Sequence, residues 1–283
     1  MPVATSRHYL MCKPEFYTVS YQINPWMDVT QPTDRGLAVA QWQLLHDTFL
    51  GLGHTVETIA PIPGLPDMVY AANGATVIDG LVYSARFRYA ERAAEGPAYQ
   101  KWFADRGYIT HTAAETNEGE GDLLAIGDLI LGGWGFRTDR TAHAEMQELF
   151  GRPVISLELV DPHFYHLDTA LTVLQNAPAD PQIAYYPAAF SAGSRAVLER
   201  LFPDAILATA ADAAALGLNA VSDGYNVIVT PGAADLAPAL RARGYNPIPV
   251  DTGELLKGGG GAKCCTLEVR GSASTPGSAS LGR

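Results

Sequence analysis

The stretch NAVSDGYNVIVTPGAADLAPALRARGYNPIPV, residues 219–250, decides the fold. Its apolar pattern predicts a strand over 219–222, a strand over 226–230, a helix over 233–243 and a strand over 247–250. Between the first two runs lies Asp223-Gly224, a recognised hairpin signal. The stretch therefore encodes one supersecondary unit in the order strand, strand, helix, strand.

The same order recurs upstream of this stretch. The predicted elements are strands 68–78 and 81–87 with helix 95–106; two strands within 123–134 with helix 141–149 and strand 154–157; and a strand near Leu171 with strand 183–186, helix 191–201 and strand 205–207. A helix over 36–51 and a strand over 54–59 precede them. Recurrence at roughly 50 to 60 residues favours repeats around an axis, whereas a doubly wound sheet would place mostly single strands between helices. We therefore expect an α/β chain of repeated ββαβ units.

The length is enough for one large domain or two small ones, and we expect a single domain over residues 1–270. The chain has 283 residues, of which 47% are hydrophobic and 17% charged, enough for a substantial core. Residues 271–283 (GSASTPGSASLGR) contain almost no core-forming side chain. This Gly/Ser/Ala-rich end predicts a disordered tail.

Charge and cysteine usage narrow the partners and the compartment. The net charge of −11 argues against nucleic acid or an anionic membrane as a partner. No apolar stretch of about 18 residues occurs, and the first residues lack the apolar core of a signal peptide. Three cysteines, two of them adjacent, make a poor disulfide framework and lack zinc spacing. We expect a cytoplasmic protein without a bound metal.

The sequence KGGGGAKCCT, residues 257–266, carries the strongest chemical signal. Cysteine is a nucleophile as the thiolate, and nearby positive charge lowers its pKa. Glycine lets a backbone approach a ligand closely. The segment predicts a loop that presents an activated thiol to a small substrate. A flexible glycine linker followed by two buried cysteines is the alternative.

Two further segments carry polar side chains that suit such a site. His166 stands two residues before Asp168 at the start of a predicted strand, where positions i and i+2 face the same side. The alternative is a polar strand end facing solvent. Residues 117–122 (NEGEGD) alternate carboxylates with glycine but are too short for an EF-hand loop, so a surface acidic turn is their alternative. Residues 67–74 (DMVYAANG) end in Asn-Gly, which alone would indicate a turn.

Taken in order, these segments resemble one family. The order is Asp-x-Val-aromatic-x-x-Asn from Asp67, Glu-Gly-x-Gly-Asp from Glu118, Gly-Phe-Arg-Thr around Arg137, His-Leu-Asp-Thr from His166, and the glycine run before Cys264. It resembles the guanidine-modifying enzymes of the pentein fold, namely arginine deiminases, dimethylargininases and amidinotransferases. The resemblance spans residues 8–269, and residues 11–14 and 21–27 are similar to bacterial dimethylargininases and arginine dihydrolases. It implies a five-bladed, pseudo-symmetric αβ propeller of ββαβ units.

The resemblance also implies roles for individual residues. Cys264 would be the nucleophile with Cys265 as its neighbour, His166 the acid and base, and Glu118 the carboxylate that orients His166. The substrate-binding residues would be Asp67, Asn73, Asn24, Arg92, Arg137 and Asp168. Arg92 and Arg137 would clamp the α-carboxylate of the substrate. Arg86 and Arg88 are alternatives to Arg92.

The implied activity is hydrolysis of the guanidinium group of free arginine or a methylated arginine through a covalent thiouronium on Cys264. The products would be citrulline with ammonia or a methylamine or, after a second hydrolysis, ornithine and ammonia. No cofactor is expected, the partner is a small guanidino compound, and homo-oligomerisation is left open. An amidinotransferase and a non-catalytic metabolite-binding α/β protein are the alternatives. Ala72 and Asn73 stand where animal-type dimethylargininases have an acidic pair, and one residue is inserted in the commonly found Glu-Gly-Gly-Asp motif. Both differences resemble arginine dihydrolases and favour free arginine.

Overall fold

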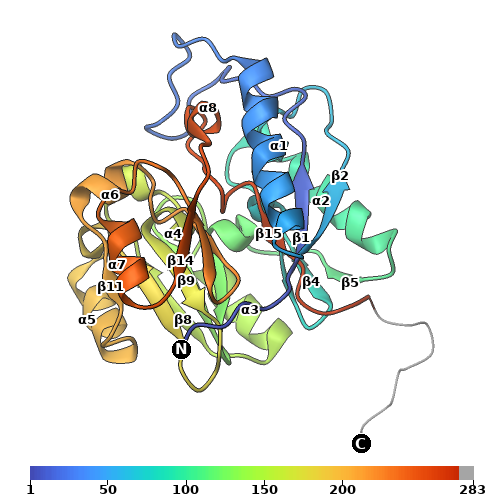
Figure 1. Cartoon of the computed structure of the whole chain (residues 1–283). Helices are drawn as coiled ribbons and strands as arrows, with labels where there is room; N and C mark the ends of the chain where they lie inside the picture. Colours follow the sequence, from blue (N-terminus) through green and yellow to red (C-terminus); the bar gives the residue numbers. More distant parts are fainter. Residues whose placement is uncertain (274–283) are drawn as a thin grey trace, which may run out of the picture.

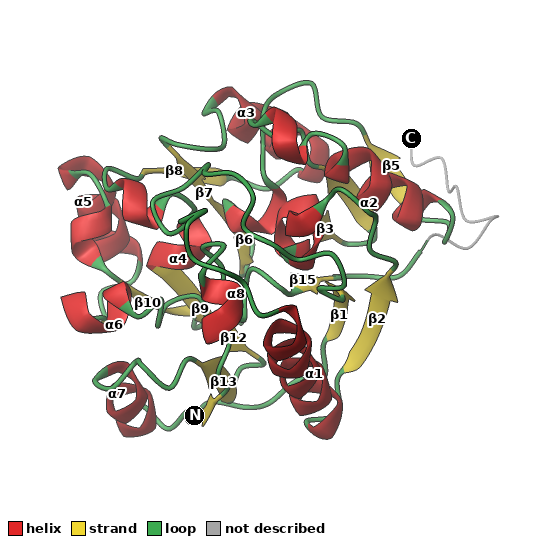
Figure 2. Cartoon of the chain, turned by 90° about the horizontal axis from the view of Figure 1, so that it is seen from above, coloured by secondary structure: helices red, strands yellow, loops and turns green. Residues whose placement is uncertain are grey.

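The computed structural model describes residues 1–273 and contains five three-stranded sheets (Figures 1 and 2). In each sheet an antiparallel pair is extended by a parallel third strand. The sheets are, in order, β15 (Leu267–Glu268), β1 (His8–Cys12) and β2 (Thr55–Ile59); β3 (Ala75–Ile78), β4 (Leu81–Ser84) and β5 (Ile109–His111); β6 (Leu123–Ile126), β7 (Leu129–Trp134) and β8 (Val154–Glu158); β9 (Leu171–Gln175), β10 (Gln182–Tyr185) and β11 (Ile206–Leu207); and β12 (Val221–Ser222), β13 (Asn226–Val229) and β14 (Asn246–Pro249). The predicted ββαβ units and the five-bladed α/β propeller are confirmed.

One helix connects the second and third strands of each sheet. These helices are α1 (Arg35–Gly51), α2 (Glu95–Ala104), α3 (Thr141–Phe150), α5 (Ala192–Leu201) and α7 (Leu236–Ala242). Seen from above, they lie outside the ring of sheets (Figure 2). In α1 the buried side chains recur at helical spacing, at Ala38, Trp42, Leu45 and Phe49, so one face packs on the core. A further helix, α6 (Ala210–Ala214), follows β11.

The first sheet closes the ring by joining the two ends of the chain. Tyr9 of β1 pairs with Glu268 of the C-terminal strand on one side and with Val56 of β2 on the other. β15 also contacts β3, while β9 contacts both β6 and β12. These first strands therefore lie innermost, around the propeller axis.

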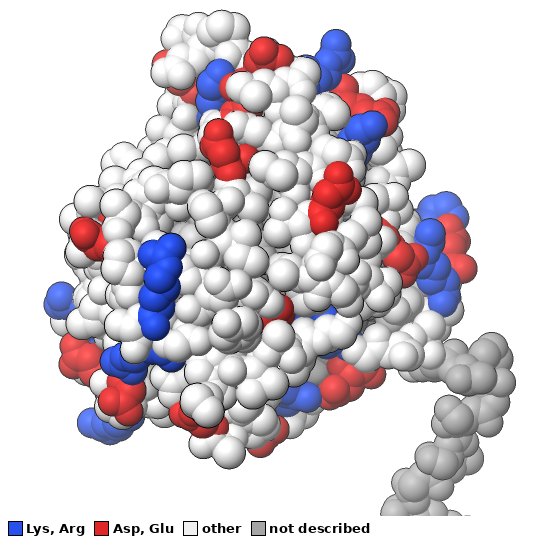
Figure 3. All heavy atoms as spheres, in the orientation of Figure 1, with Lys and Arg blue, Asp and Glu red and all other residues white. Residues whose placement is uncertain are grey.

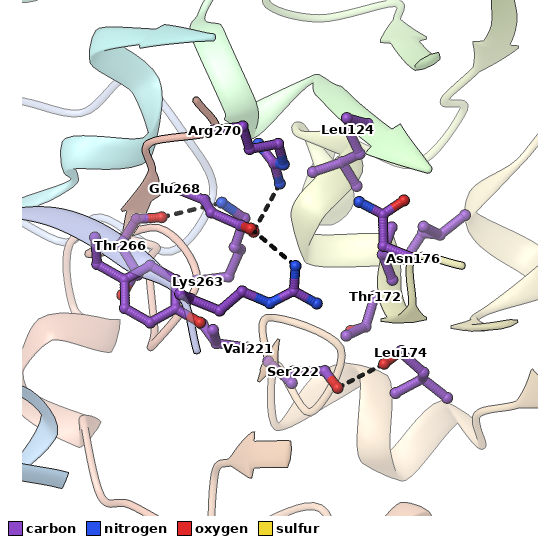
Figure 4. Close-up of a pocket in the computed structure, with 16 residues that line it drawn as sticks. Leu124, Thr172, Leu174, Asn176, Val221, Ser222, Lys263, Thr266, Glu268 and Arg270 are labelled. Atoms are coloured by element: carbon purple, nitrogen blue, oxygen red, sulfur yellow. Dashed lines mark hydrogen bonds and ion pairs between the residues drawn. The ribbon is translucent and has the colours of Figure 1, made fainter. Parts of the chain in front are cut away.

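Polar side chains gather around a small cavity of about 40 Å³ beside these inner strands. Lys263, Glu268 and Arg270 surround it, as Figure 4 shows. Arg270 pairs with Glu268 at 2.8 Å and also with Glu120, and Lys263 lies 2.7 Å from Glu120. These ion pairs tie the chain that follows the glycine run to the acidic segment of the third unit.

Two predicted elements have a different local structure. Residues 68–78 are not one strand, because β3 begins at Ala75 after two 3₁₀ turns, Pro66–Val69 and Ala71–Gly74. The N–H of Ala72 donates to the carbonyl of Cys264 at 3.0 Å instead of to a strand partner. His166 likewise precedes a helical turn, α4 (Leu167–Ala170), and not a strand.

One face of the molecule carries few charged side chains (Figure 3). On the face drawn in Figure 3, acidic and basic side chains are scattered and form no continuous basic patch among the described residues. Within residues 1–273, no helix is long and apolar enough to cross a bilayer. Most of the predicted tail, residues 274–283, lies outside the described residues.

Candidate active site

The glycine run is a packed loop, which contradicts the flexible-linker alternative. It follows α8 (Gly253–Leu256), and Gly258 to Gly261 are all buried. Gly259 has φ +92°, a conformation that side chains disfavour. A Cβ atom on Gly260 would lie 2.6 Å from the ring of Tyr70. The close packing of this backbone fixes the position of Cys264, which follows Gly261 by three residues.

Cys264 is buried, with 2% of its surface exposed, and its thiol is held between two polar groups. The Sγ atom lies 3.2 Å from Oδ2 of Asp168 and 3.1 Å from Nδ2 of Asn219. Burial and the Asp168 carboxylate raise the pKa of the Cys264 thiol well above its ordinary value. In the absence of a ligand, Cys264 therefore donates its proton toward Asp168.

The predicted influence of the flanking lysines is wrong. Lys257 lies 2.9 Å from Glu254, and Lys263 lies 2.7 Å from Glu120. Each ammonium group is thus paired with a carboxylate, and burial and Asp168 are the largest causes that raise the pKa of Cys264. The loop geometry was predicted correctly, but the charge that would activate the thiol has to come from elsewhere.

His166 and Glu118 form a buried pair. His166 Nε2 lies 2.8 Å from Oε2 of Glu118, which also accepts from Nη1 of Arg137 at 2.8 Å. Burial alone would raise the pKa of Glu118, but Arg137 and His166 together hold it well below its usual range. The Arg137 guanidinium lies 4.7 Å from the ring centres of both Tyr89 and Tyr165. Glu118 is therefore ionised and fixes the orientation of the imidazole ring.

Three buried side-chain polar atoms in this region lack a hydrogen-bond partner. They are Oδ1 of Asp67, Nδ1 of His166 and Oδ1 of Asp168. Buried polar atoms are normally satisfied, so these atoms indicate a missing donor. A guanidinium group has N–H donors arranged in a plane and carries a positive charge. The side chains present therefore suit a guanidinium ligand.

Asp67 and Asn73 are positioned by Arg92. The Arg92 guanidinium donates to Oδ1 of Asn73 at 2.8 Å and forms a two-bond pair with Glu95, at 3.0 and 2.8 Å. Tyr21 donates to Oδ2 of Asp67 at 2.9 Å. Burial raises the pKa of Asp67 despite the nearby Arg92. Arg92 is in the site, whereas Arg86 and Arg88 are exposed.

Both arginines that were predicted to bind the substrate carboxylate form hydrogen bonds within the protein. Arg137 donates to Glu118 and, at 2.9 Å, to the carbonyl of Ile23, while Arg92 is bound to Glu95 and Asn73. The role of Arg92 and Arg137 in binding a substrate carboxylate stays a prediction. What the geometry adds is that each arginine already orients a neighbouring polar side chain of the site.

Asn24 contacts the glycine run. Its Nδ2 donates to the carbonyl of Gly258 at 3.0 Å, and its Oδ1 accepts from the N–H of Trp26 at 2.9 Å. A surface groove of about 690 Å³ is lined in part by Tyr21. Tyr21 also binds Asp67, so one side chain contacts both the groove and the site.

Sequence reasoning missed three polar residues of the site. Asp122, the last carboxylate of the NEGEGD segment, accepts from the N–H of Leu167 at 3.0 Å and lies 4.0 Å from His166 Nε2. Glu95 was hidden in a helix that carried no motif. Asn219 belongs to residues 219–250, from which the fold was predicted. No motif around it in the sequence indicates a residue of the site. Within residues 1–273, no group of three His, Cys, Asp or Glu side chains is placed to hold a metal ion.

Asp168→Asn is expected to stabilise the protein at pH 8 and to have little effect at pH 4.5. Burial raises the pKa of Asp168 to about 7 from its ordinary 3.8. Between these values the folded chain keeps a proton that the unfolded chain has released, so this group costs stability as the pH rises. Asparagine carries no charge to bury. Thermal unfolding at both pH values, with the exposed Asp128→Asn as the control, measures the difference, and an equal gain at both would contradict it.

The chain is similar to known enzymes over nearly its whole length. It is 55% identical over 264 residues to an N(G),N(G)-dimethylarginine dimethylaminohydrolase of Mycobacterium tuberculosis, with 93% of this chain and 86% of the relative covered. It is 36% identical over 273 residues to the bifunctional arginine dihydrolase/ornithine cyclodeaminase AgrE of Nostoc, and there 94% of this chain spans only 38% of the relative. No protein-family model matches the chain.

Solved structures agree with this similarity. The substrate-bound N-terminal domain of ArgZ, a cyanobacterial arginine dihydrolase, has a TM-score of 0.88 and 32% identity, and the similarity covers 95% of this chain and 100% of that domain. Another structure of that domain is covalently bound to a reaction intermediate. The fold and the site together define a pentein-type αβ propeller. The chain belongs to the family of dimethylarginine dimethylaminohydrolases and arginine dihydrolases.

Proposed function

We propose that this protein hydrolyses the guanidinium group of free L-arginine with Cys264 as the nucleophile. The observation that carries the proposal is the Asp168 carboxylate at 3.2 Å from the Cys264 thiol, together with the unpartnered buried polar atoms on Asp67, His166 and Asp168. Carboxylates around a guanidinium hold its plane and its charge, and this positioning supplies much of the rate. The covalently bound intermediate of the ArgZ domain is in keeping with this chemistry.

The substrate itself would activate the thiol. Burial and Asp168 raise the pKa of Cys264 in the free protein, and the paired lysines do not offset them. A guanidinium placed against Asp168 brings a positive charge into the buried site, which favours both the carboxylate and the thiolate. Cys264 is thus less reactive in the free protein than in the complex with substrate.

The reaction follows from the positions of the side chains. The sulfur attacks the guanidine carbon, and the thiol proton reaches the departing nitrogen by way of His166, so that ammonia leaves and a thiouronium remains. Glu118 binds Nε2 of His166, which leaves Nδ1 as the atom that moves the proton. His166 then takes a proton from water, and hydroxide attack releases citrulline and restores the thiol. A second hydrolysis, of the ureido group of citrulline, would give ornithine, carbon dioxide and ammonia.

Asn73 favours arginine over its methylated forms. An uncharged amide stands at this position, held by Arg92 at 2.8 Å and donating to the carbonyl of Glu118 at 3.4 Å. Dimethylarginine is the second candidate substrate, because the relative of 55% identity is a dimethylarginine dimethylaminohydrolase. Cytoplasmic location and oligomeric state stay predictions.

Incubation with arginine and with asymmetric dimethylarginine in parallel tests the proposal. We expect arginine to be consumed with the higher kcat/KM, with citrulline or ornithine and ammonia as products, measured by mass spectrometry and an ammonia assay. Preferential release of dimethylamine would identify dimethylarginine, and not arginine, as the substrate. Consumption of neither compound, by a protein shown to be folded, would contradict guanidine hydrolysis.

A further inference from the structure

Asn219 precedes the strands of the fifth sheet, and its side chain contacts the loop that carries Gly261 and Cys264. It precedes β12, is buried with 2% of its surface exposed, and its carbonyl accepts from the N–H of Lys263 at 3.2 Å. Its own N–H donates to the carbonyl of Leu216 at 3.0 Å. The backbone of Asn219 is therefore hydrogen-bonded through both its N–H and its carbonyl group.

The orientation of the Asn219 amide follows from its partners. Oδ1 accepts from the N–H of Gly261 at 2.9 Å and from the N–H of Cys264 at 3.1 Å. Since backbone N–H groups only donate, the oxygen must face them, and a flipped amide would oppose donors with donors. Nδ2 therefore faces the other way, to the carbonyl of Asp168 and to Sγ of Cys264, each at 3.1 Å.

We infer that Asn219 is a catalytic residue, whose Nδ2–H donates a hydrogen bond to the Cys264 sulfur and stabilises its thiolate form. The inference rests on the proposed function of Cys264. A neutral thiol is a weak acceptor, and a thiolate is a stronger one because a hydrogen bond to a charged group is stronger. The bond therefore gains strength as the sulfur ionises.

The surroundings of Cys264 give this donor particular weight. Burial, Asp168 and Cys265 all raise the pKa of Cys264, and the hydrogen bond from Asn219 opposes them. The amide is neutral, so it supports the thiolate without adding a positive charge that would repel a guanidinium. The two halves of the side chain thus have separate roles: Oδ1 holds the loop and Nδ2 acts on the sulfur.

Asn219→Asp separates these two roles. It keeps an acceptor for the N–H groups of Gly261 and Cys264 but replaces the donor at the sulfur by a carboxylate oxygen. The readout is the rate of alkylation of Cys264 by 2-chloroacetamidine as a function of pH, followed by peptide mass spectrometry without substrate. We expect the alkylation curve to move at least one pH unit upward, which is a tenfold lower rate at a fixed pH below the transition. Turnover of arginine should fall at least tenfold in kcat, with a smaller change in KM.

Controls keep a structural effect apart from an effect on the sulfur. Asn246→Asp makes the same change at an exposed amide of the same unit, in β14, and should leave the curve unmoved. Asn219→Ala removes both the Oδ1 acceptor and the Nδ2 donor. Its unfolding temperature relative to Asn219→Asp measures how much the acceptor at Oδ1 contributes to stability. If Asn219→Asp does not fold, Asn219→Ala provides the alkylation curve, for which an upward shift is also expected.

An alkylation curve of a folded Asn219 variant that coincides with that of the parent would overturn the inference. Failure of the proposed function has a different signature. The parent would then not consume arginine, although the pH curve of Cys264 alkylation could still move in the variant. Cys264→Ser, which should not be labelled at that position, confirms where the reagent reacts.

Discussion

Replacement of Cys264 by alanine is expected to reduce arginine hydrolysis by at least about 10⁴-fold, because no other group supplies the attacking atom. Cys264 Sγ lies beside Asp168 and Asn219, among the unpartnered acceptors of the site. Steady-state turnover, with the unfolding temperature measured on the same samples, checks the expectation. Residual turnover above a hundredth of the parent rate would remove Cys264 from the nucleophile role.

Cys265→Ala is the matched control for this change. Cys265 is fully buried in a hydrophobic cluster, and burial raises the pKa of its thiol. Its loss should cost about 1 kcal/mol of stability, as for a small buried apolar group, and should change kcat by less than a few-fold. A Cys265 variant as inactive as the Cys264 variant would show that the loop structure, and not the sulfur of Cys264, limits activity.

Replacement of His166 by alanine should lower kcat by about 10²- to 10⁴-fold, the usual effect of removing a general acid and base. Substrate binding should be partly retained, because Asp67 and Asp168 remain in place. Rapid-quench kinetics with equilibrium binding of arginine separates the two effects. His163→Ala is the control: His163 is exposed, and its carbonyl contact with Trp26 survives the change. Normal turnover of the His166 variant would exclude it from proton transfer.

Local periodicity predicts most of the propeller but not its closure. The repeats around 123–157 and 219–250 were predicted from strand and helix periods, and the structure confirms them. β1, β5 and β15 were not predicted. β15 has only two residues and therefore no readable period, and its partner β1 lies at the other end of the chain. Pairing of chain ends is a tertiary event, which no window of sequence contains.

The positions of the site residues could be predicted in part, through the order of the motifs. Cys264 lies beside Asp168 and His166 lies beside Glu118, and His166 and Asp168 are joined by a helical turn and not by a shared strand face. The two lysines next to the glycine run were expected to influence the Cys264 thiol because they are close to it in sequence. In the structure Glu254 pairs with Lys257 and Glu120 pairs with Lys263, which the sequence does not show. Asn219 was missed because its contacts join segments that are 45 residues apart.

The central claim is that a covalent thiouronium forms on Cys264, and mass spectrometry of the quenched enzyme tests it most directly. Arginine labelled with ¹³C at the guanidine carbon is mixed with the enzyme and stopped in acid during turnover. The predicted result is a Cys264 peptide heavier by arginine less one ammonia, carrying the label. A Cys264 peptide that gains only the amidino group would identify an amidinotransferase, and turnover with an adduct on Cys12 or Cys265, or on no cysteine, would contradict the claim.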